Sequence, residues 1–78
     1  MEITVNIFFK EGVLDPQGKA IQKALHSLNF HKVSEVKIAK QIKIKLDEKD
    51  KEKAKKEVIQ MCEELLVNSV IEDYELVL

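Results

Sequence analysis

The chain has 78 residues, with 13 lysines, no arginine and 14 acidic side chains, so its net charge is −1. The lack of arginine disfavours nucleic-acid recognition and phosphate transfer, because both usually rely on guanidinium contacts to phosphate or guanine. We expect one domain over residues 1–78, of marginal stability as a monomer, and the lone cysteine, the absence of a signal-like N-terminus and the absence of a membrane-length apolar run predict a cytoplasmic protein.

The first predicted element is a strand in "EITVNIFF", residues 2–9. Odd-numbered residues are apolar in this run and even-numbered residues are polar, which is typical of a strand with one buried face. Phe8 is the exception, since it places a large apolar ring among the polar positions.

A helix is predicted after the turn "KEGVLD". Asp15 is a suitable N-cap, Pro16 suits the first helical position, and Asn29 suits the left-handed position that follows a helix. Gly18 costs about 1 kcal/mol relative to alanine inside such a helix, so we expect some other group to approach its backbone closely. The apolar residues at helical spacing are Ala20, Ile21, Ala24, Leu25 and Leu28.

Two further strands are predicted in "KVSEVKIA" and "KQIKIKL", joined by a tight connection near Ala39 and Lys40. The lysine-rich run that follows predicts a second helix, capped by Asp47 or Asp50 and ended by Asn68. "VIEDYELVL" predicts a last strand. The apolar stripe of the second helix comprises Ala54, Val58, Met61, Cys62 and Leu65.

The order β-α-β-β-α-β predicts an α+β fold of ferredoxin-like architecture, with an antiparallel sheet and both helices on one of its faces. The other face of the sheet stays uncovered, and such a face can pair with another sheet or subunit. The predicted residues of this open face are Thr4, Asn6, Phe8, Lys43, Lys45, Asp73, Glu75 and Val77.

No set of side chains predicts a catalytic or metal site. His26 and His31 have neither an evident partner acid or nucleophile nor a usual metal-binding spacing, which favours solvated or capping roles. Cys62 lies on an apolar stripe, which favours a buried and unreactive thiol. A surface charge cluster explains the remaining acids better than a cation site, because their spacing does not match a calcium loop. These acids are Glu63, Glu64, Glu72 and Asp73.

Three stretches of the chain resemble one known family. "KEGVLDPQGKAIQKALHSLNF", "VSEVKIAKQIKIKLD" and "MCEELLVNSVIEDYELVL" are similar to the small accessory subunit of phosphoribosylformylglycinamidine synthase, the PurS family. The similarity runs from Val5 to Leu78, and its most specific parts are "GVLDPQGKA" and "NSVIEDY".

The resemblance implies a subunit without an active site or a bound cofactor of its own. The family assembles with a glutaminase subunit and a large synthetase subunit, which together use glutamine, ATP and magnesium to convert formylglycinamide ribonucleotide to the amidine in purine biosynthesis. It also implies a dimer or tetramer that bridges these subunits and helps ammonia to pass between them. The residues that we expect to contact a partner or dimer mate are Phe8, Gly12, Asp15, Gln17, Gly18, Lys19, Asn68 and Asp73.

The chain departs from the family pattern at three positions. It has Asn29 and Ala39 where the family usually has glycine, and Ser69 where the family usually has proline. Ala39 puts the predicted turn in doubt, because a positive φ would be strained there.

Two rival functions are weighed against the subunit role. A dimeric ferredoxin-like regulatory module that binds a small metabolite would usually show a glycine-rich loop, of which Gly12 and Gly18 are a weak version. An acylphosphatase-like enzyme is disfavoured, since its phosphate site would need an arginine.

Overall fold

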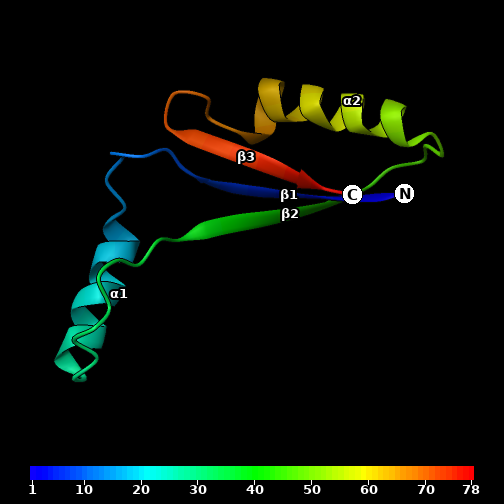
Figure 1. Cartoon of the computed structure of the whole chain (residues 1–78). Helices are drawn as coiled ribbons and strands as arrows, with labels where there is room; N and C mark the ends of the chain where they lie inside the picture. The colour runs from blue at the N-terminus through cyan, green and yellow to red at the C-terminus, as the bar shows by residue number, and fades with distance from the viewer.

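The computed structural model describes residues 1–78 as three strands, two α-helices and one π-helical turn (Figure 1). The α+β class, with an antiparallel sheet and two helices, is therefore confirmed. In chain order the elements are β1 (Glu2–Phe9), α1 (Pro16–Ser27), β2 (Ala39–Lys45), α2 (Lys51–Met61), the π-helical turn η1 (Cys62–Leu66) and β3 (Glu72–Val77).

The three strands form one antiparallel sheet in the order β2-β1-β3. In this register Asn6 of the central strand lies opposite Gln41 on one side and Glu75 on the other. The alternation in β1 sends its odd-numbered side chains to one face, where α2 covers them. The six apolar residues of the resulting core are Ile3, Val5, Ile7, Ala54, Val58 and Cys62.

α2 begins at an N-cap supplied by Asp50, one of the two predicted candidates. The Asp50 carboxylate accepts hydrogen bonds from the backbone amides of Glu52 at 2.9 Å and Lys53 at 3.3 Å. The helix passes into η1 and ends at Leu66, two residues before the predicted end. Its buried residues, Ala54, Val58 and Cys62, recur at every fourth position and therefore form one apolar stripe. This stripe packs the helix against the sheet.

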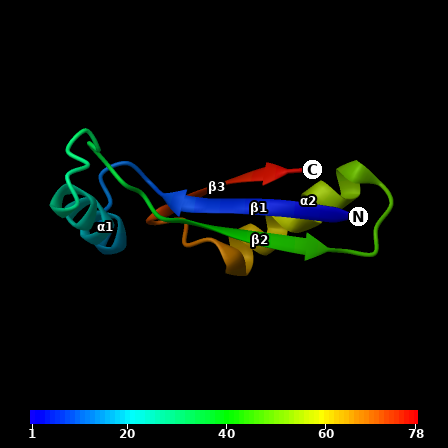
Figure 2. The same ribbon diagram turned by 90° about the horizontal axis from the view of Figure 1, so that it is seen from below.

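α1 stands away from the sheet. Figures 1 and 2 show it projecting beyond the end of β1, and the molecule extends over 49 × 23 × 14 Å. None of the core residues comes from α1. We call residues 15–38, which comprise α1 and the extended chain that returns from its tip, the arm.

Two details of the predicted fold are wrong. Only α2 covers the sheet, because α1 is bound through its polar face to the returning chain and is carried away with it. The segment 33–38 is not a strand of the sheet, and Ala39 lies inside β2 rather than in a turn. The strain considered for Ala39 does not arise, since Asn29 is the only non-glycine residue with a positive φ, at 74°.

Candidate functional site

One face of α1 binds the backbone of the returning chain. The residues of this face follow one another at intervals of three or four, so they lie in one row along the helix. We call this row the polar seam. It comprises Asp15, Gly18, Gln22 and His26.

Asp15 closes the base of the seam with both carboxylate oxygens. Oδ1 accepts a hydrogen bond from the Gly18 amide at 2.9 Å, which caps α1 as predicted. Oδ2 accepts a hydrogen bond from the Ile38 amide at 2.8 Å. These bonds, that from Ile38 first and that from Gly18 second, lower the pKa of the Asp15 carboxyl below its usual range. A single side chain thus holds the start of α1 against the end of the returning chain.

The rest of the seam continues this contact toward the tip. Gly18 is buried, and a Cβ added to it would overlap the carbonyl oxygen of Val36. The predicted close approach at Gly18 is therefore confirmed, and the approaching group belongs to the same chain. Gln22 Nε2 donates to the Ser34 carbonyl at 2.9 Å, and His26 Nε2 donates to the Val33 carbonyl at 2.7 Å.

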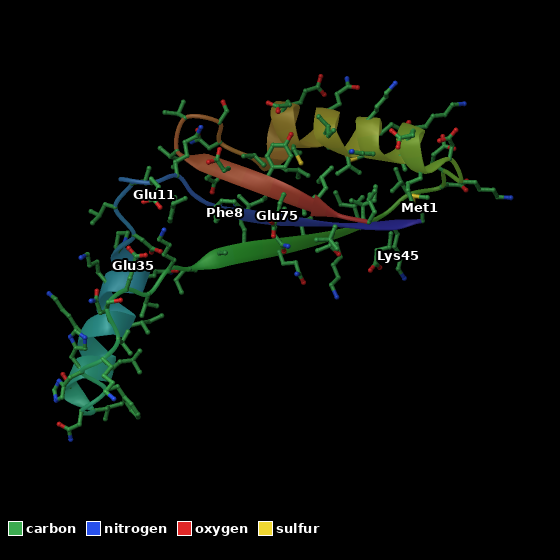
Figure 3. All side chains as sticks on the ribbon, viewed as in Figure 1. Met1, Phe8, Glu11, Glu35, Lys45 and Glu75 are labelled. Atoms are coloured by element: carbon green, nitrogen blue, oxygen red, sulfur yellow. The ribbon has the colours of Figure 1, made fainter.

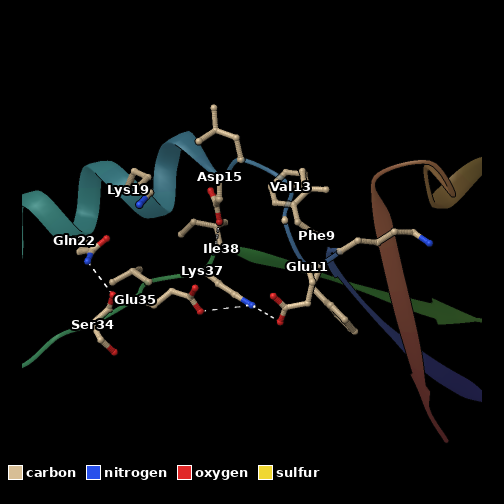
Figure 4. Close-up of a pocket in the computed structure, with 15 residues that line it drawn as sticks. Phe9, Glu11, Val13, Asp15, Lys19, Gln22, Ser34, Glu35, Lys37 and Ile38 are labelled. Atoms are coloured by element: carbon tan, nitrogen blue, oxygen red, sulfur yellow. Dashed lines mark hydrogen bonds and ion pairs between the residues drawn. The ribbon is translucent and has the colours of Figure 1, made fainter.

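A hollow lies at the base of the arm, between the loop that leaves β1 and the returning chain (Figure 4). The Lys37 ammonium lies 3.5 Å from the Glu11 carboxylate and 3.5 Å from the Glu35 carboxylate. These two charges, with Glu11 the stronger, raise the pKa of Lys37 above its usual range. Exposed ion pairs contribute little stability, so Lys37, Glu11 and Glu35 matter mainly as surface charges at the base of the arm.

Large apolar side chains are exposed on the arm and directly before it. Leu14 is 70% exposed, Leu28 is 65% exposed and Phe30 is 57% exposed. Ile21 lies seven residues, about two helical turns, before Leu28 and is also exposed. A 12-residue helix with cover on one face only is marginal in water, so the exposed apolar side chains make the arm a candidate surface for contact with another chain.

The second uncovered surface is the sheet face opposite α2, and its exposure was predicted. Gln41 Nε2 donates to Asn6 Oδ1 at 3.0 Å, and Asn6 Nδ2 donates to Glu75 Oε1 at 3.2 Å, so one polar row crosses all three strands. Lys45 and Glu75 project from this face (Figure 3). Phe8 lies at its arm end and is 38% exposed.

The residues predicted to contact a partner lie on the first turns of α1 or at the arm end of the sheet. At the arm end of the sheet, Lys10 joins the end of β1 to the start of β3 through a backbone hydrogen bond to the Ile71 carbonyl at 2.9 Å and an ion pair with Asp73 at 3.3 Å. Contact with another chain stays a prediction for all eight residues. They are Phe8, Gly12, which has φ +81°, Asp15, Gln17, Gly18, Lys19, Asn68 and Asp73.

The remaining reactive side chains, those of Cys62 and Tyr74, have structural rather than catalytic environments. Cys62 is buried, as predicted, and desolvation followed by the charge of Glu63 raises the pKa of its thiol. The Tyr74 hydroxyl donates to the Glu63 carboxylate at 3.1 Å, and desolvation raises the pKa of Tyr74. No three His, Cys, Asp or Glu side chains are grouped so as to hold a metal ion, and no helix has the length and apolar character needed to cross a membrane.

Sequence reasoning missed the roles of Gln22, His26 and Lys37. A signal was present for the first two, because together with Asp15 and Gly18 they occupy one helix face at intervals of three or four residues. Nothing in the sequence showed that the target of this face would be a backbone segment rather than solvent.

Comparison with known proteins connects this architecture to a family. The family model described as PurS, phosphoribosylformylglycinamidine (FGAM) synthase, matches residues 2–78. The chain belongs to the PurS family. The PurS subunit of Methanocaldococcus jannaschii is 49% identical over 73 residues, which are 94% of this chain and 88% of that protein. The PurS subunit of Bacillus subtilis is 44% identical, over 94% of this chain and 86% of that protein.

Solved PurS structures share the whole fold, arm included. The crystal structure of PurS from Methanocaldococcus jannaschii matches with a TM-score of 0.87, covering 97% of this chain and 92% of that chain. A chain in the PurLQS structure from Thermotoga maritima, 33% identical, matches with a TM-score of 0.88 and covers 97% of this chain and 93% of that chain. Matches of this coverage include residues 15–38, so the projecting arm is part of the PurS fold.

Proposed function

We propose that this chain is the accessory subunit of phosphoribosylformylglycinamidine synthase, a glutamine-hydrolysing, ATP-dependent ligase, and that it is not catalytic alone. It associates with copies of itself, bridges a glutaminase subunit and a large synthetase subunit, and assists the passage of ammonia between them in the cytoplasm. ATP and magnesium are used by the other subunits of the complex.

The arm is the observation that carries this proposal. It exposes a run of apolar side chains, contributes nothing to the core of its own chain, and is shared with a chain of the PurLQS structure. An element of this kind is stable when another chain covers it. Family membership therefore favours the subunit role over a dimeric module that binds a small metabolite.

Reconstitution with the glutaminase and synthetase subunits of the same organism tests the proposal. With glutamine, ATP and magnesium present, we expect the chain to co-elute with both subunits in size-exclusion chromatography. Leaving the chain out should abolish synthesis of the amidine from glutamine but spare synthesis from added ammonium, because the synthetase retains its own active site. Full glutamine-dependent activity without the chain, together with separate elution, would refute the proposed role.

A further inference from the structure

The tip of the arm brings two histidine rings together. His26 lies in the last turn of α1, and His31 lies in the turn that follows the helix. Their ring centroids are 6.3 Å apart, and the ring planes are tilted by 37°. Because the two residues lie on opposite sides of a helix end, their proximity arises from the way in which α1 terminates and not from helical spacing.

The end of α1 fixes the backbone between the two rings. Asn29 has a positive φ of 74°. The Asn29 amide donates to the His26 carbonyl at 3.0 Å, and the Phe30 amide donates to the Leu25 carbonyl at 2.9 Å. A left-handed residue with this pair of hydrogen bonds is a Schellman motif. The backbone that carries His31 back to the helix is therefore already ordered, so a ligand held by both rings would lose little affinity to ordering it.

The His26 ring is oriented so that one nitrogen stays free. Its Nε2 donates a hydrogen bond to the Val33 carbonyl at 2.7 Å, since a carbonyl oxygen can only accept. In the neutral imidazole, Nδ1 is then the unprotonated nitrogen with an available lone pair. Histidines that bind a metal ion through one ring nitrogen usually donate from the other to a carbonyl or carboxylate. The polar seam thus supplies the supporting hydrogen bond of a metal ligand.

His31 supplies a second imidazole next to open space. Its side chain is exposed, and it lines a shallow hollow at the arm tip. Water molecules in this hollow can complete the coordination of an ion that the two rings hold. The hollow is lined by Asn29, Phe30, His31, Lys32 and Val33.

We propose that His26 and His31 bind one divalent transition-metal ion, of the class of Zn²⁺ and Cu²⁺, at the tip of the arm. Metal–nitrogen bonds place the ion roughly 3.2 Å from each ring centre, so one ion can join rings whose centres are up to roughly 6.4 Å apart. The observed separation of 6.3 Å is within this limit, and rotation of the exposed His31 side chain can shorten it.

The surroundings of the two rings determine which ions suit the site. Imidazole ligands without a carboxylate favour Zn²⁺, Ni²⁺ and Cu²⁺ over Mg²⁺ and Ca²⁺, which prefer oxygen ligands. The C-terminal end of α1 carries a partial negative charge that favours a bound cation. Lys23 and Lys32 lie close to the histidines in the sequence and oppose it, so the affinity is expected to be modest.

A bound ion would stabilise the arm without any other chain. It would join the last turn of α1 to the start of the returning chain, and a ligand that binds only the folded form stabilises that form. We therefore expect Zn²⁺ to slow amide hydrogen exchange over residues 27–33 of the full chain and to leave exchange in β1 unchanged.

Calorimetric titration of the full chain with Zn²⁺ tests the site. At mildly alkaline pH, where imidazole is neutral, we expect one ion per chain, with shifts in the imidazole proton resonances of both His26 and His31. Cu²⁺ should bind more tightly than Zn²⁺, and Mg²⁺ should not bind. One ion per two chains would overturn the proposal, because the ion would then join histidines of different molecules.

Three variants test the assignment of the ligands. His26→Gln retains an amide donor for the Val33 carbonyl but removes the free ring nitrogen, and His31→Ala removes an exposed ring. Each should weaken Zn²⁺ binding by more than about tenfold. Lys32→Ala is the matched control and should bind Zn²⁺ at least as tightly as the unmodified chain. Unchanged affinity in either histidine variant, or no binding to the unmodified chain at millimolar Zn²⁺, would overturn the site.

Discussion

Asp15 holds two parts of the chain together with one carboxylate. Oδ1 binds the amide of Gly18 in α1, and Oδ2 binds the amide of Ile38 at the end of the arm. The carboxyl group accepts both amide hydrogen bonds at once in its ionised form. These bonds therefore favour the ionised form and lower the pKa of Asp15. The orientation of the arm at its base is therefore linked to the charge of a single residue.

Acidification should loosen the base of the arm. The pKa of Asp15 in the folded chain lies below its ordinary value of 3.8, so the stabilisation is complete above pH 3.8 and is lost as the pH falls through the lower, folded value. Amide proton resonances of Gly18 and Ile38 should shift together over this range. Asp15→Asn should remove the step, and its persistence in that variant would contradict the role of Asp15.

Gly18→Ala should destabilise the arm although alanine normally favours a helix by about 1 kcal/mol. The added methyl group would overlap the Val36 carbonyl oxygen, and such overpacking typically costs about 1–3 kcal/mol. Amide hydrogen exchange should become faster over residues 16–38 and remain unchanged in β1. Gln17→Ala, at an exposed neighbouring position of the helix, is the matched control and should have no effect; equal exchange in the two variants would show that Gly18 is unconstrained.

The thiol of Cys62 should be unreactive in the folded chain. Burial raises its pKa, so at neutral pH the nucleophilic thiolate is suppressed and access is blocked as well. Labelling with iodoacetamide at pH 7 should be slow without denaturant and fast in urea. Rapid labelling of the native chain would mean that α2 and η1 leave the sheet readily.

At the scale of elements, α1 differs from α2 in what its apolar residues contact. Ala54 and Val58 of α2 are fully buried against β1, whereas Ile21 and Leu28 at the arm remain exposed. Both helices are amphipathic in sequence. The difference in burial therefore arises from the connections of α1, which place it away from the sheet. The exposed residues of the arm are thus available to stabilise an assembly.

Replacing Ile21 and Leu28 together by glutamate should separate assembly from folding. We expect weaker self-association and weaker binding to the other synthase subunits, with little change in the free energy of unfolding of the sheet in urea. Val58→Ala is the complementary variant: it should lose roughly 2 kcal/mol of stability because it leaves a cavity in the core. A large loss of sheet stability in the arm variant would mean that α1 supports the core after all.

Most of the local structure could be predicted from the sequence, but the placement of α1 could not. The cap at Asp15, the left-handed Asn29 and the alternation in β1 follow from local chemistry and were predicted, whereas Asp50 was one of two candidate caps for α2. The spacing of apolar residues in α1 indicates only that one face of the helix is to be covered. The same spacing is expected whether the sheet or another chain covers that face. The segment 33–38 alternates like a strand, yet one of its edges is occupied by the polar seam and the other is free.

As a whole, the molecule is elongated and has a small core. Only 7 of its 78 residues are buried, and the longest dimension of 49 Å is more than three times the shortest. A chain of this size buries little apolar surface, so association with other chains would add to its stability. The open sheet face, the outer edge of β2 and the apolar side of the arm are three surfaces that an assembly would cover.

Hydrogen exchange of α1 in the dilute chain and in the reconstituted synthase tests the central claim most directly, namely that the arm is completed by other chains. We predict fast amide exchange over residues 16–27 in a chain diluted until it is monomeric, and strong protection of the same amides in the complex, with β1 protected in both. Equal protection of α1 in the monomer and the complex would contradict the account, because the arm would then be stable without a partner.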